Sequence, residues 1–556
     1  MSLAFREFKQ RVVLYADDWW CGLRDKRSIS ATFLLYFATL GPAITFAFYL
    51  EERTGGSIGV VEVLLSTALC GVFFAIFGGQ PLVIVGVTGP VTVFYETLYQ
   101  IGVNQLQLPF LPLVACVSFW GGAILFILGS FGAPTVVKYV TRFSDEIFGL
   151  LVAVLFLQSA VTEFNKQFDD AELDAALLSL MLGLGTFALA MALQNARQWR
   201  FLRSWLRGAI ADYGTVFSIV FFSACALLPR LQEADAPRLD VPNRFQPTVP
   251  RAWVVDFEGF PTWAVFASII PGSMIAILFF LDHNISVRLS QDAIFGLKKP
   301  TAYNYDTILL GLAMCIVGVF GLPACNCLIP QAPLHVRALA KIRKVEDARV
   351  SETDLGRAAR AAGQREVWLS VTETRIAALA QSILLAVTLA PPFLYLLSWV
   401  RRGVLAGFFL VMAFASFPGS ALVERTMLLC TDRSLVSAYY SAPYVELPIR
   451  VIGSFICVQH ACVALIFALT FTPASMGFPV LIGLLVPLRL FVITRFFSSD
   501  ALKLLDPFDS DGTTAAGDRA TGPVAAYGPE SRLALTVAEQ FVMEDVVIDD
   551  SRTLRL

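Results

Sequence analysis

The stretch "GLPACNCLIPQAPLHV", residues 321–336, decides the fold. It is mostly apolar, yet it contains three prolines and an asparagine. Proline lacks a backbone N–H and clashes with the preceding helical turn, so it interrupts a helix. In a chain that crosses a membrane, unpaired backbone is tolerated only where it is buried in protein or lines a cavity. The stretch therefore predicts a broken helix beside a functional cavity.

Composition indicates an integral membrane protein. Of the 556 residues, 56% are hydrophobic and 15% are charged, whereas about a quarter of a soluble domain is charged. The lipid bilayer is thus an expected partner, and the lack of a basic patch argues against nucleic acid. The ten cysteines are scattered, and the C-x-C of Cys325 and Cys327 is too little for a metal site. We expect no cofactor, no metal and no enzyme activity.

Hydropathy predicts an all-α polytopic protein with about fourteen membrane segments. A helix needs about 20 apolar residues to cross a bilayer, and twelve windows of suitable length are present. Two shorter segments, near 80–98 and 326–341, are interrupted by proline and glycine. The twelve windows are 30–50, 58–78, 110–132, 146–163, 174–194, 209–229, 262–283, 303–322, 375–397, 403–418, 450–472 and 475–494.

Basic residues give the orientation. They cluster before the first window and in alternate loops, which all fall on one side if each broken segment counts as a crossing. The positive-inside rule makes that side cytoplasmic, so both termini are expected inside. The predicted parts are a cytoplasmic N-terminal segment (1–28), a first seven-segment repeat (29–229), an extracellular connecting loop (230–261), a second seven-segment repeat (262–500) and a cytoplasmic tail (501–556).

The two broken segments occupy the same place, third, in each half of the chain. Because each half has an odd number of segments, the halves are expected to be inverted relative to each other. Interrupted helices at matching positions of two repeats point to a transport site. In the first, "GVTGPVTVF", Thr88 can cap the half-helix that starts near Gly89. Opposed helix N-termini, each with about half a positive charge, would form an anion site; the alternative is two ordinary kinks.

Three further side chains are candidates for the substrate-binding site. Asp282 ends an apolar run, where a carboxylate is a functional residue by default, although a helix end at the membrane interface explains it as well. Asn326 and Gln331 flank the second break, where they could bind a ligand or only satisfy freed backbone groups. His283 and His335 could carry protons, but hydrogen bonding within their own helices is the simpler interpretation.

Several stretches resemble the bicarbonate-transporter and anion-exchanger superfamily, solute carrier family 4. They are "YFATLGPAITF" (36–46), "GGQPLVIVGVTGPVTVF" (78–94), "FFLDHNISVRLSQDAIFGLKKPTAYNYDTILLGL" (279–312) and "GLPACNCLIPQAPLH" (321–335), the last being most similar to the borate-transporter branch. The resemblance implies a homodimer at the plasma membrane, with core and gate domains and an elevator-like motion. It places the family's acidic residue at Asp282, and it adds Thr39 of the first stretch to the substrate-binding residues.

One departure from the exchanger pattern favours borate. Bicarbonate exchangers often carry an arginine in the tenth segment, where this chain has Gln331. A tetrahydroxylated anion needs many weak donors and acceptors, which helix dipoles, Thr88, Asn326 and Gln331 would supply. The resulting hypothesis is borate efflux, with Asp282 accepting a hydroxyl proton or carrying a coupling proton. Bicarbonate or chloride exchange on the same fold, and a non-transporting scaffold or a channel, remain as alternatives.

Overall fold

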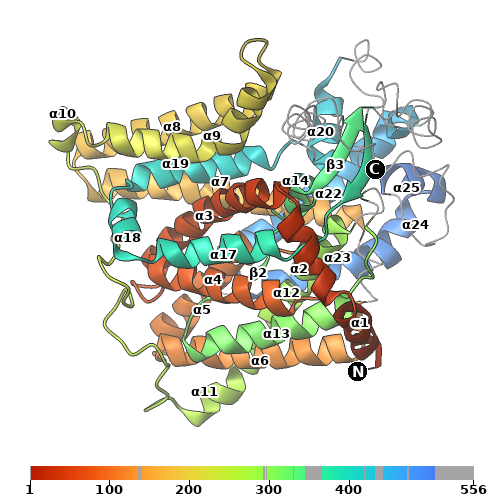
Figure 1. Cartoon of the computed structure of the whole chain (residues 1–556), viewed down its shortest axis with the longest axis horizontal. Coiled ribbons are helices and arrows are strands. Elements are labelled where there is room, and N and C mark those ends of the chain that lie inside the picture. Colours follow the sequence, from red (N-terminus) through yellow and green to blue (C-terminus); the bar gives the residue numbers. More distant parts are fainter. Residues whose placement is uncertain are drawn as a thin grey trace, which may run out of the picture.

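The computed structural model shows a predominantly helical protein whose long helices run roughly side by side (Figure 1). It describes residues 2–134, 141–291, 295, 297–329, 331–344, 366–418, 420–432, 443–472 and 475–506. Within these ranges, nine helices are long and apolar enough to cross a membrane, and a bent pair adds a tenth. The predicted helical polytopic fold is confirmed, whereas the count of fourteen segments stays a prediction. The tail beyond residue 506 lies outside the described residues.

One group of helices, here the core bundle, contains both broken segments. Within it α6 packs along α12 and α13, and α17 packs along α3 and α4. Glycines permit the closest of these approaches: a Cβ on Gly122 would lie 2.5 Å from the carbonyl oxygen of Gly311. The core bundle comprises α3 (Arg27–Arg53), α4 (Val60–Phe77), α5 (Gly89–Tyr99), α6 (Phe110–Ser130), α12 (Ile269–Ser290), α13 (Tyr303–Val319), α14 (Gln331–Ala338) and α17 (Ile376–Thr388).

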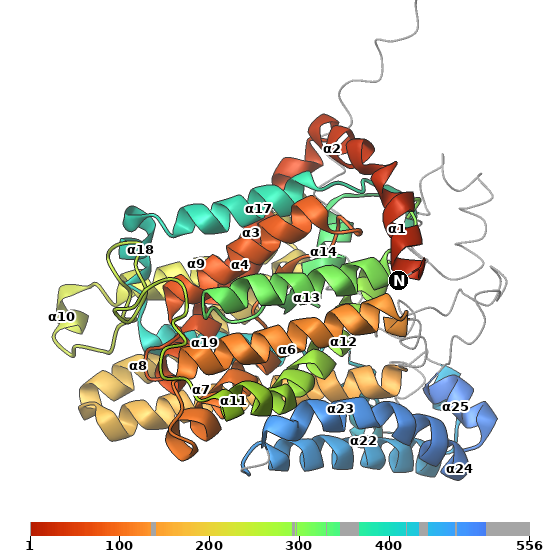
Figure 2. The same ribbon diagram turned by 90° about the horizontal axis from the view of Figure 1, so that it is seen from below.

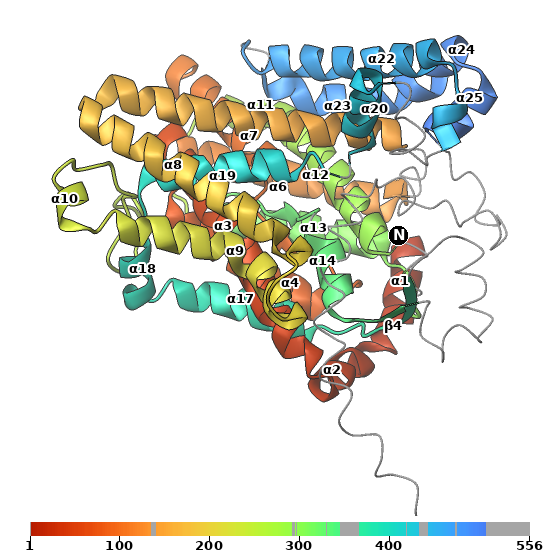
Figure 3. The ribbon, with the colours of Figure 1, turned by 90° about the horizontal axis from the view of Figure 1, so that it is seen from above.

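The remaining long helices form a second group, here the gate bundle. A Cβ on Gly407 would clash with the carbonyl of Gly183, so glycine is required where α19 crosses α8. Figures 2 and 3 show α22 and α23 along one edge of the molecule and α17 at the opposite edge. The gate bundle comprises α7 (Arg142–Asp170), α8 (Leu173–Gln194), α9 (Ser204–Cys225), α19 (Arg402–Ala415), α22 (Ile449–Leu469) and α23 (Phe478–Pro487).

Two local predictions are wrong. The window 375–397 is not one straight span: α17 and α18 (Pro391–Leu397) meet at 79°, because a proline pair starts a new helix there. The second broken segment does not continue as a helix to residue 341. It ends at Ala338, and β3 (Ala340–Lys344) then pairs antiparallel with β4 (Glu366–Val371).

Short helices complete the described structure. They are α1 (Ser2–Val12), α2 (Tyr15–Arg24), α10 (Pro229–Gln232), α11 (Thr262–Ala267), α20 (Ala421–Cys430), α24 (Thr494–Phe496) and α25 (Ser499–Leu505), together with the π-helices η1 (Gln100–Gln105) and η7 (Leu488–Ile493) and the 3-10 helices η3 (Asn195–Gln198), η5 (Pro443–Glu446) and η6 (Ser475–Gly477).

The N-terminal segment is fixed to the core bundle by buried charges. Asp18 is fully buried and accepts hydrogen bonds from Arg375 Nε at 2.9 Å and Lys299 Nζ at 2.5 Å. The Lys299 ammonium also hydrogen-bonds Asp17 and thereby lowers the pKa of that carboxyl. Removing one partner of a buried ion pair leaves an uncompensated charge. Helices α1 and α2 are therefore an integral part of the fold and lie across the end of the bundle where the chain begins (Figure 2).

Candidate functional site

The two broken segments meet through a pair of very short strands. β1 (Val85–Gly86) pairs antiparallel with β2 (Asn326–Cys327), with Val85 opposite Cys327 and Gly86 opposite Asn326. Helix α5 starts three residues after β1, and α14 starts four residues after β2. Both half-helix N-termini therefore lie beside the strand pair, and the antiparallel pairing sends the two half-helices away from it in opposite directions. Neither segment is a merely kinked continuous helix.

The first turn of α5 has the features of an open anion-binding end. Thr88 stands at the N-cap with φ −114° and ψ 159°, but its side chain makes no capping bond, so the expectation that it caps the helix is wrong. Its Oγ1 is buried and has no hydrogen-bond partner among the described residues. Helix N-termini with free N–H groups attract anions. A Cβ on Gly89 would lie 2.5 Å from Cε1 of Phe156, so the gate bundle closes directly over this turn.

The first residue of α14 connects the second break to helix α3. Gln331 Nε2 donates to the carbonyl of Ala38 at 2.9 Å, which places Gln331 beside Thr39. The free oxygens Gln331 Oε1 and Thr39 Oγ1 are buried and lack a partner within the described part of the chain. Thr39 is 2% exposed. Buried polar atoms are normally hydrogen-bonded, so exceptions call for a ligand or water. Thr88 and Gln331 thus each bring one such neutral oxygen to a break, and Thr39 brings a third from α3, in the residue after the one that Gln331 contacts.

Asn326 has a different role from these three. Its Oδ1 accepts the backbone N–H of Cys327 at 2.8 Å, and its Nδ2 lies 3.4 Å from the carbonyl of Phe279. The amide oxygen therefore satisfies a backbone N–H of the broken segment itself, and the amide nitrogen connects that segment to helix α12. This geometry agrees with the structural alternative for Asn326, which shapes the site from within strand β2.

Asp282 lies inside the protein and not at a helix end. Helix α12 continues eight residues beyond it, to Ser290, and Asp282 is 2% exposed. The neighbouring residues on that face contact the second break: Phe279 through its carbonyl, His283 through Cys327, and Ser286 through the carbonyl of Leu328 at 3.4 Å. Residues three and four apart share a helix face. The prediction that a helix end explains Asp282 is wrong, because the carboxylate is buried within α12, between residues that contact the second break.

No hydrogen bond or ion pair holds Asp282 among the residues that the structure describes. An unpaired buried carboxylate is costly, because the charge loses its hydration without compensation. Such a group persists in a membrane protein where a substrate or a coupling ion needs it. Asp306, another buried carboxylate of the core bundle, is different: it accepts the N–H groups of Gly79 at 2.5 Å and Gln80 at 3.1 Å. Asp306 fixes the chain that leads into β1.

The sequence-based prediction named the wrong hydrogen-bond partners for two histidines. His283 Nδ1 lies 2.9 Å from Cys327 Sγ, and His335 Nδ1 lies 2.9 Å from the carbonyl oxygen of Leu82. Neither ring is satisfied by its own helix, whereas His460 does contact its own helix at Ile456. Sequence reasoning also missed Tyr95, whose hydroxyl accepts the N–H of Ala324 at 2.9 Å. The only signal for Tyr95 is its place six residues after Gly89.

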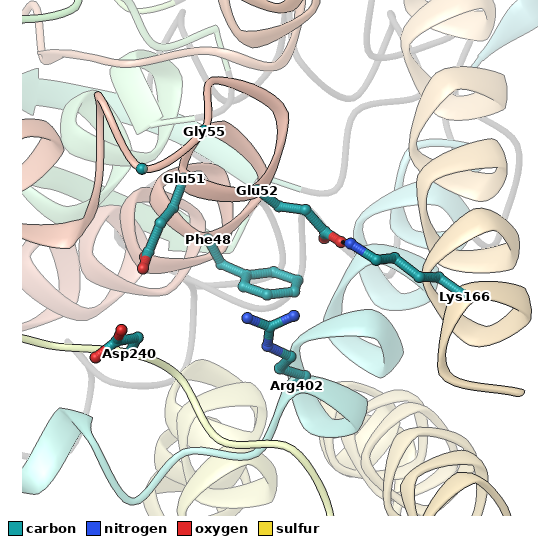
Figure 4. Close-up of a pocket in the computed structure, with 8 residues that line it drawn as sticks. Phe48, Glu51, Glu52, Gly55, Lys166, Asp240 and Arg402 are labelled. Atoms are coloured by element: carbon teal, nitrogen blue, oxygen red, sulfur yellow. Dashed lines mark hydrogen bonds and ion pairs between the residues drawn. The ribbon is translucent and has the colours of Figure 1, made fainter. Parts of the chain in front are cut away.

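A separate pocket of about 290 Å³ lies where the two bundles meet at the end predicted to be extracellular (Figure 4). Phe48, Glu51 and Glu52 come from the end of α3, Lys166 from α7 and Arg402 from the start of α19. Lys166 forms an ion pair with Glu52, and the Arg402 guanidinium lies 5.3 Å from the centroid of the Phe48 ring. These contacts connect the core bundle to the gate bundle.

Paired broken helices in an apolar helical fold define a class of protein: a membrane transporter built of two inverted repeats. The comparison with known families agrees, since the family described as "HCO3- transporter integral membrane domain" matches residues 4–173 and 163–510. The chain belongs to this family. It is thus an anion transporter by family, which agrees with the expectation that it is not an enzyme.

Individual relatives share most of their length with the chain. A putative transporter of Schizosaccharomyces pombe is 32% identical over 501 residues, covering 90% of this chain and 94% of the relative. Boron transporter 1 of Saccharomyces cerevisiae is 31% identical over 509 residues, covering 90% and 84%. Among solved structures, the transmembrane domain of the cyanobacterial bicarbonate transporter BicA has a TM-score of 0.55 at 13% identity, covering 81% of this chain and 98% of that one. This last likeness concerns the fold alone.

Proposed function

We propose that the chain is a borate efflux transporter of the plasma membrane that works by alternating access. Borate is a tetrahedral anion with four hydroxyl groups, each of which can both donate and accept hydrogen bonds. The site offers two helix N-termini for the charge and, for the hydroxyls, three neutral oxygens on Thr39, Thr88 and Gln331 that have no partner among the described residues. This combination is the observation that carries the proposal. The boron-transporter name of the yeast relative supports the same substrate.

The arrangement of the bundles supports an elevator-type motion. All five polar side chains of the site, on α3, α12, β2, α14 and the N-cap of α5, belong to the core bundle, while the gate bundle supplies the apolar cover Phe156. A core bundle that carries the entire site can move past the gate bundle with its substrate. We further propose that 29–229 and 262–500 are the two repeats, joined by 230–261, that both termini are cytoplasmic, and that the transporter is a homodimer.

A flux measurement tests the proposed function. The purified full chain is reconstituted into liposomes, and boron content is followed by mass spectrometry after an outward borate gradient is imposed. We expect saturable boron flux that bicarbonate and chloride inhibit only weakly. Flux of bicarbonate or chloride without boron flux would favour the anion-exchange alternative. Non-saturable flux would indicate a channel, and no flux of any of these anions would favour a scaffold.

The ion pair of Lys166 with Glu52 connects the two bundles at the end predicted to be extracellular, so breaking it should shift the protein toward the state that is open on that side. Lys166 is 44% exposed and Glu52 is 12% exposed, so their ion pair is worth at most about 1 kcal/mol. Lys166→Glu should therefore open the outer side only modestly, raising the labelling rate of a Phe156→Cys reporter by about two- to fivefold with a membrane-impermeant thiol reagent. The matched control is the swap Glu52→Lys with Lys166→Glu, which should restore the parent rate. An unchanged rate in the single variant would show that the pair does not hold the outer side closed.

A further inference from the structure

We propose that Tyr95 and His335 are reciprocal positioning residues, each on one half-helix and each holding the chain that enters the strand of the other repeat. Tyr95 on α5 accepts the N–H of Ala324, just before β2, at 2.9 Å. His335 on α14 contacts the carbonyl oxygen of Leu82, just before β1, at 2.9 Å. This inference rests on the proposed transport site, because the two contacts would set the alignment of the half-helix N-termini.

The two contacts are related by the inverted repeat. Since Val85 pairs with Cys327 and Gly86 with Asn326, a two-fold axis through the strand pair relates Val85 to Asn326. Tyr95 lies ten residues after Val85, and His335 lies nine residues after Asn326. Their partners lie two residues before β2 and three residues before β1. The two repeats therefore place an equivalent side-chain contact at the same position to within one residue. The phenol of Tyr95 accepts a hydrogen bond in one repeat, and the imidazole of His335 donates one in the other.

The strand pair needs such support. Each strand has only two residues, so few ladder hydrogen bonds hold the breaks together, and even an isolated hairpin of ordinary length is marginal. Both side chains are fully buried, and water cannot easily replace either contact. A side chain anchored on one half-helix and bonded to the other repeat converts the weak strand pair into a rigid frame. The frame then keeps the first-turn N–H groups of α5 and α14 directed at the same ligand.

The hydrogen-bond chemistry fixes the tautomer of His335. A carbonyl oxygen only accepts, so Nδ1 must carry the proton that bonds Leu82. In the neutral ring Nε2 is then an unprotonated acceptor, and it has no partner within the described ranges. The positioning role therefore belongs to Nδ1, and any direct role in proton or substrate binding would belong to Nε2. The two roles can be separated by substitution.

Two isosteric variants of His335 separate the positioning role of Nδ1 from a direct role of Nε2. His335→Asn places an amide N–H near the position of Nδ1, whereas His335→Gln places it near Nε2. In the liposome assay, we expect His335→Asn to keep the half-saturating borate concentration within about twofold, and His335→Gln to raise it about tenfold, with similar maximal rates for both. The opposite order would overturn the proposal, because it would assign the function to Nε2. Equal activity of both variants would also overturn it.

Tyr95→Phe tests the other contact, because it removes only the hydroxyl that accepts the N–H of Ala324. It should raise the half-saturating borate concentration about tenfold with little change in maximal rate or in folded yield, as judged by size-exclusion chromatography. The matched control is Tyr99→Phe, which removes the same atom one turn further along α5 and should change neither parameter. If both His335 variants fail to fold, Tyr95→Phe decides alone. Unchanged kinetics, or loss of folded protein, in Tyr95→Phe would contradict a positioning role.

Failure of this inference and failure of the proposed function are distinguishable. Wild-type protein that transports bicarbonate but no borate would overturn the substrate proposal, and the same variants would then be compared by their half-saturating bicarbonate concentration. Wild-type protein that transports borate, with variants that behave as wild type, would overturn the positioning role alone.

Discussion

Asp282→Asn is expected to reduce borate flux by at least about 100-fold without lowering the thermal stability of the purified protein. The activity falls because an amide cannot take up a proton, and general acid–base steps contribute a hundredfold or more. The stability holds because Asp282 is buried without a partner among the described residues, so that removing its charge breaks no ion pair and relieves a desolvation cost. Initial rates in liposomes and the unfolding temperature of the same preparation are the two measurements.

Asp306→Asn is the contrasting control, since it replaces another buried carboxylate of the core bundle. Asp306 accepts two backbone N–H groups ahead of β1, so its loss should lower the unfolding temperature or the yield of folded protein. Retained flux in Asp282→Asn would remove Asp282 from the mechanism. A large loss of stability in Asp282→Asn, equal to that of Asp306→Asn, would show that Asp282 is a structural residue.

Gln331→Arg has the second largest expected effect, a change of substrate preference. The guanidinium would add a full positive charge at the N-terminus of α14, where Gln331 now presents a neutral oxygen. We expect borate flux to fall at least about tenfold and flux of bicarbonate or chloride to rise, because a fixed charge favours small anions over a hydroxylated ligand bound by many weak contacts. The ratio of borate to bicarbonate flux is the quantity to measure.

Gln105→Arg is the matched control for the added charge, because Gln105 is exposed in η1, at the end of the first broken segment that is predicted to be extracellular. It should leave the flux ratio unchanged. A Gln331→Arg variant with the parent ratio would show that the residue at this position does not determine selectivity.

The long helices and both breaks were predictable from local sequence. Apolar windows of about 20 residues and the Pro- and Gly-containing motifs around Gly89 and Gln331 act within a few residues of chain, so their signal is direct. The bend between α17 and α18 was missed because a hydropathy window averages across Pro391 and its neighbour. The end of α14 at Ala338 was missed because β3 depends on β4, a distant partner.

The contacts that build the site were not predictable either, because they join residues that are far apart in the chain. Strands β1 and β2 are two residues long and 240 residues apart in the chain, too short to show an alternating pattern. The hydrogen bond from Gln331 to Ala38, and the pair of Asp18 with Arg375, join residues that only tertiary packing brings together. Sequence could nominate Asp282, Thr88 and Gln331, but it could not show that the Thr88 hydroxyl and the Gln331 amide oxygen lack partners among the described residues, or that no ion pair holds Asp282 there.

The central claim is that a hydroxylated anion binds between the N-termini of α5 and α14. The most direct test is a cryo-electron microscopy structure of the full chain at saturating borate, compared with one without borate. We predict density for a tetrahedral ligand within hydrogen-bonding distance of the first turns of both half-helices and of Thr39, Thr88 or Gln331. Borate density located elsewhere in a transport-competent preparation would contradict the account.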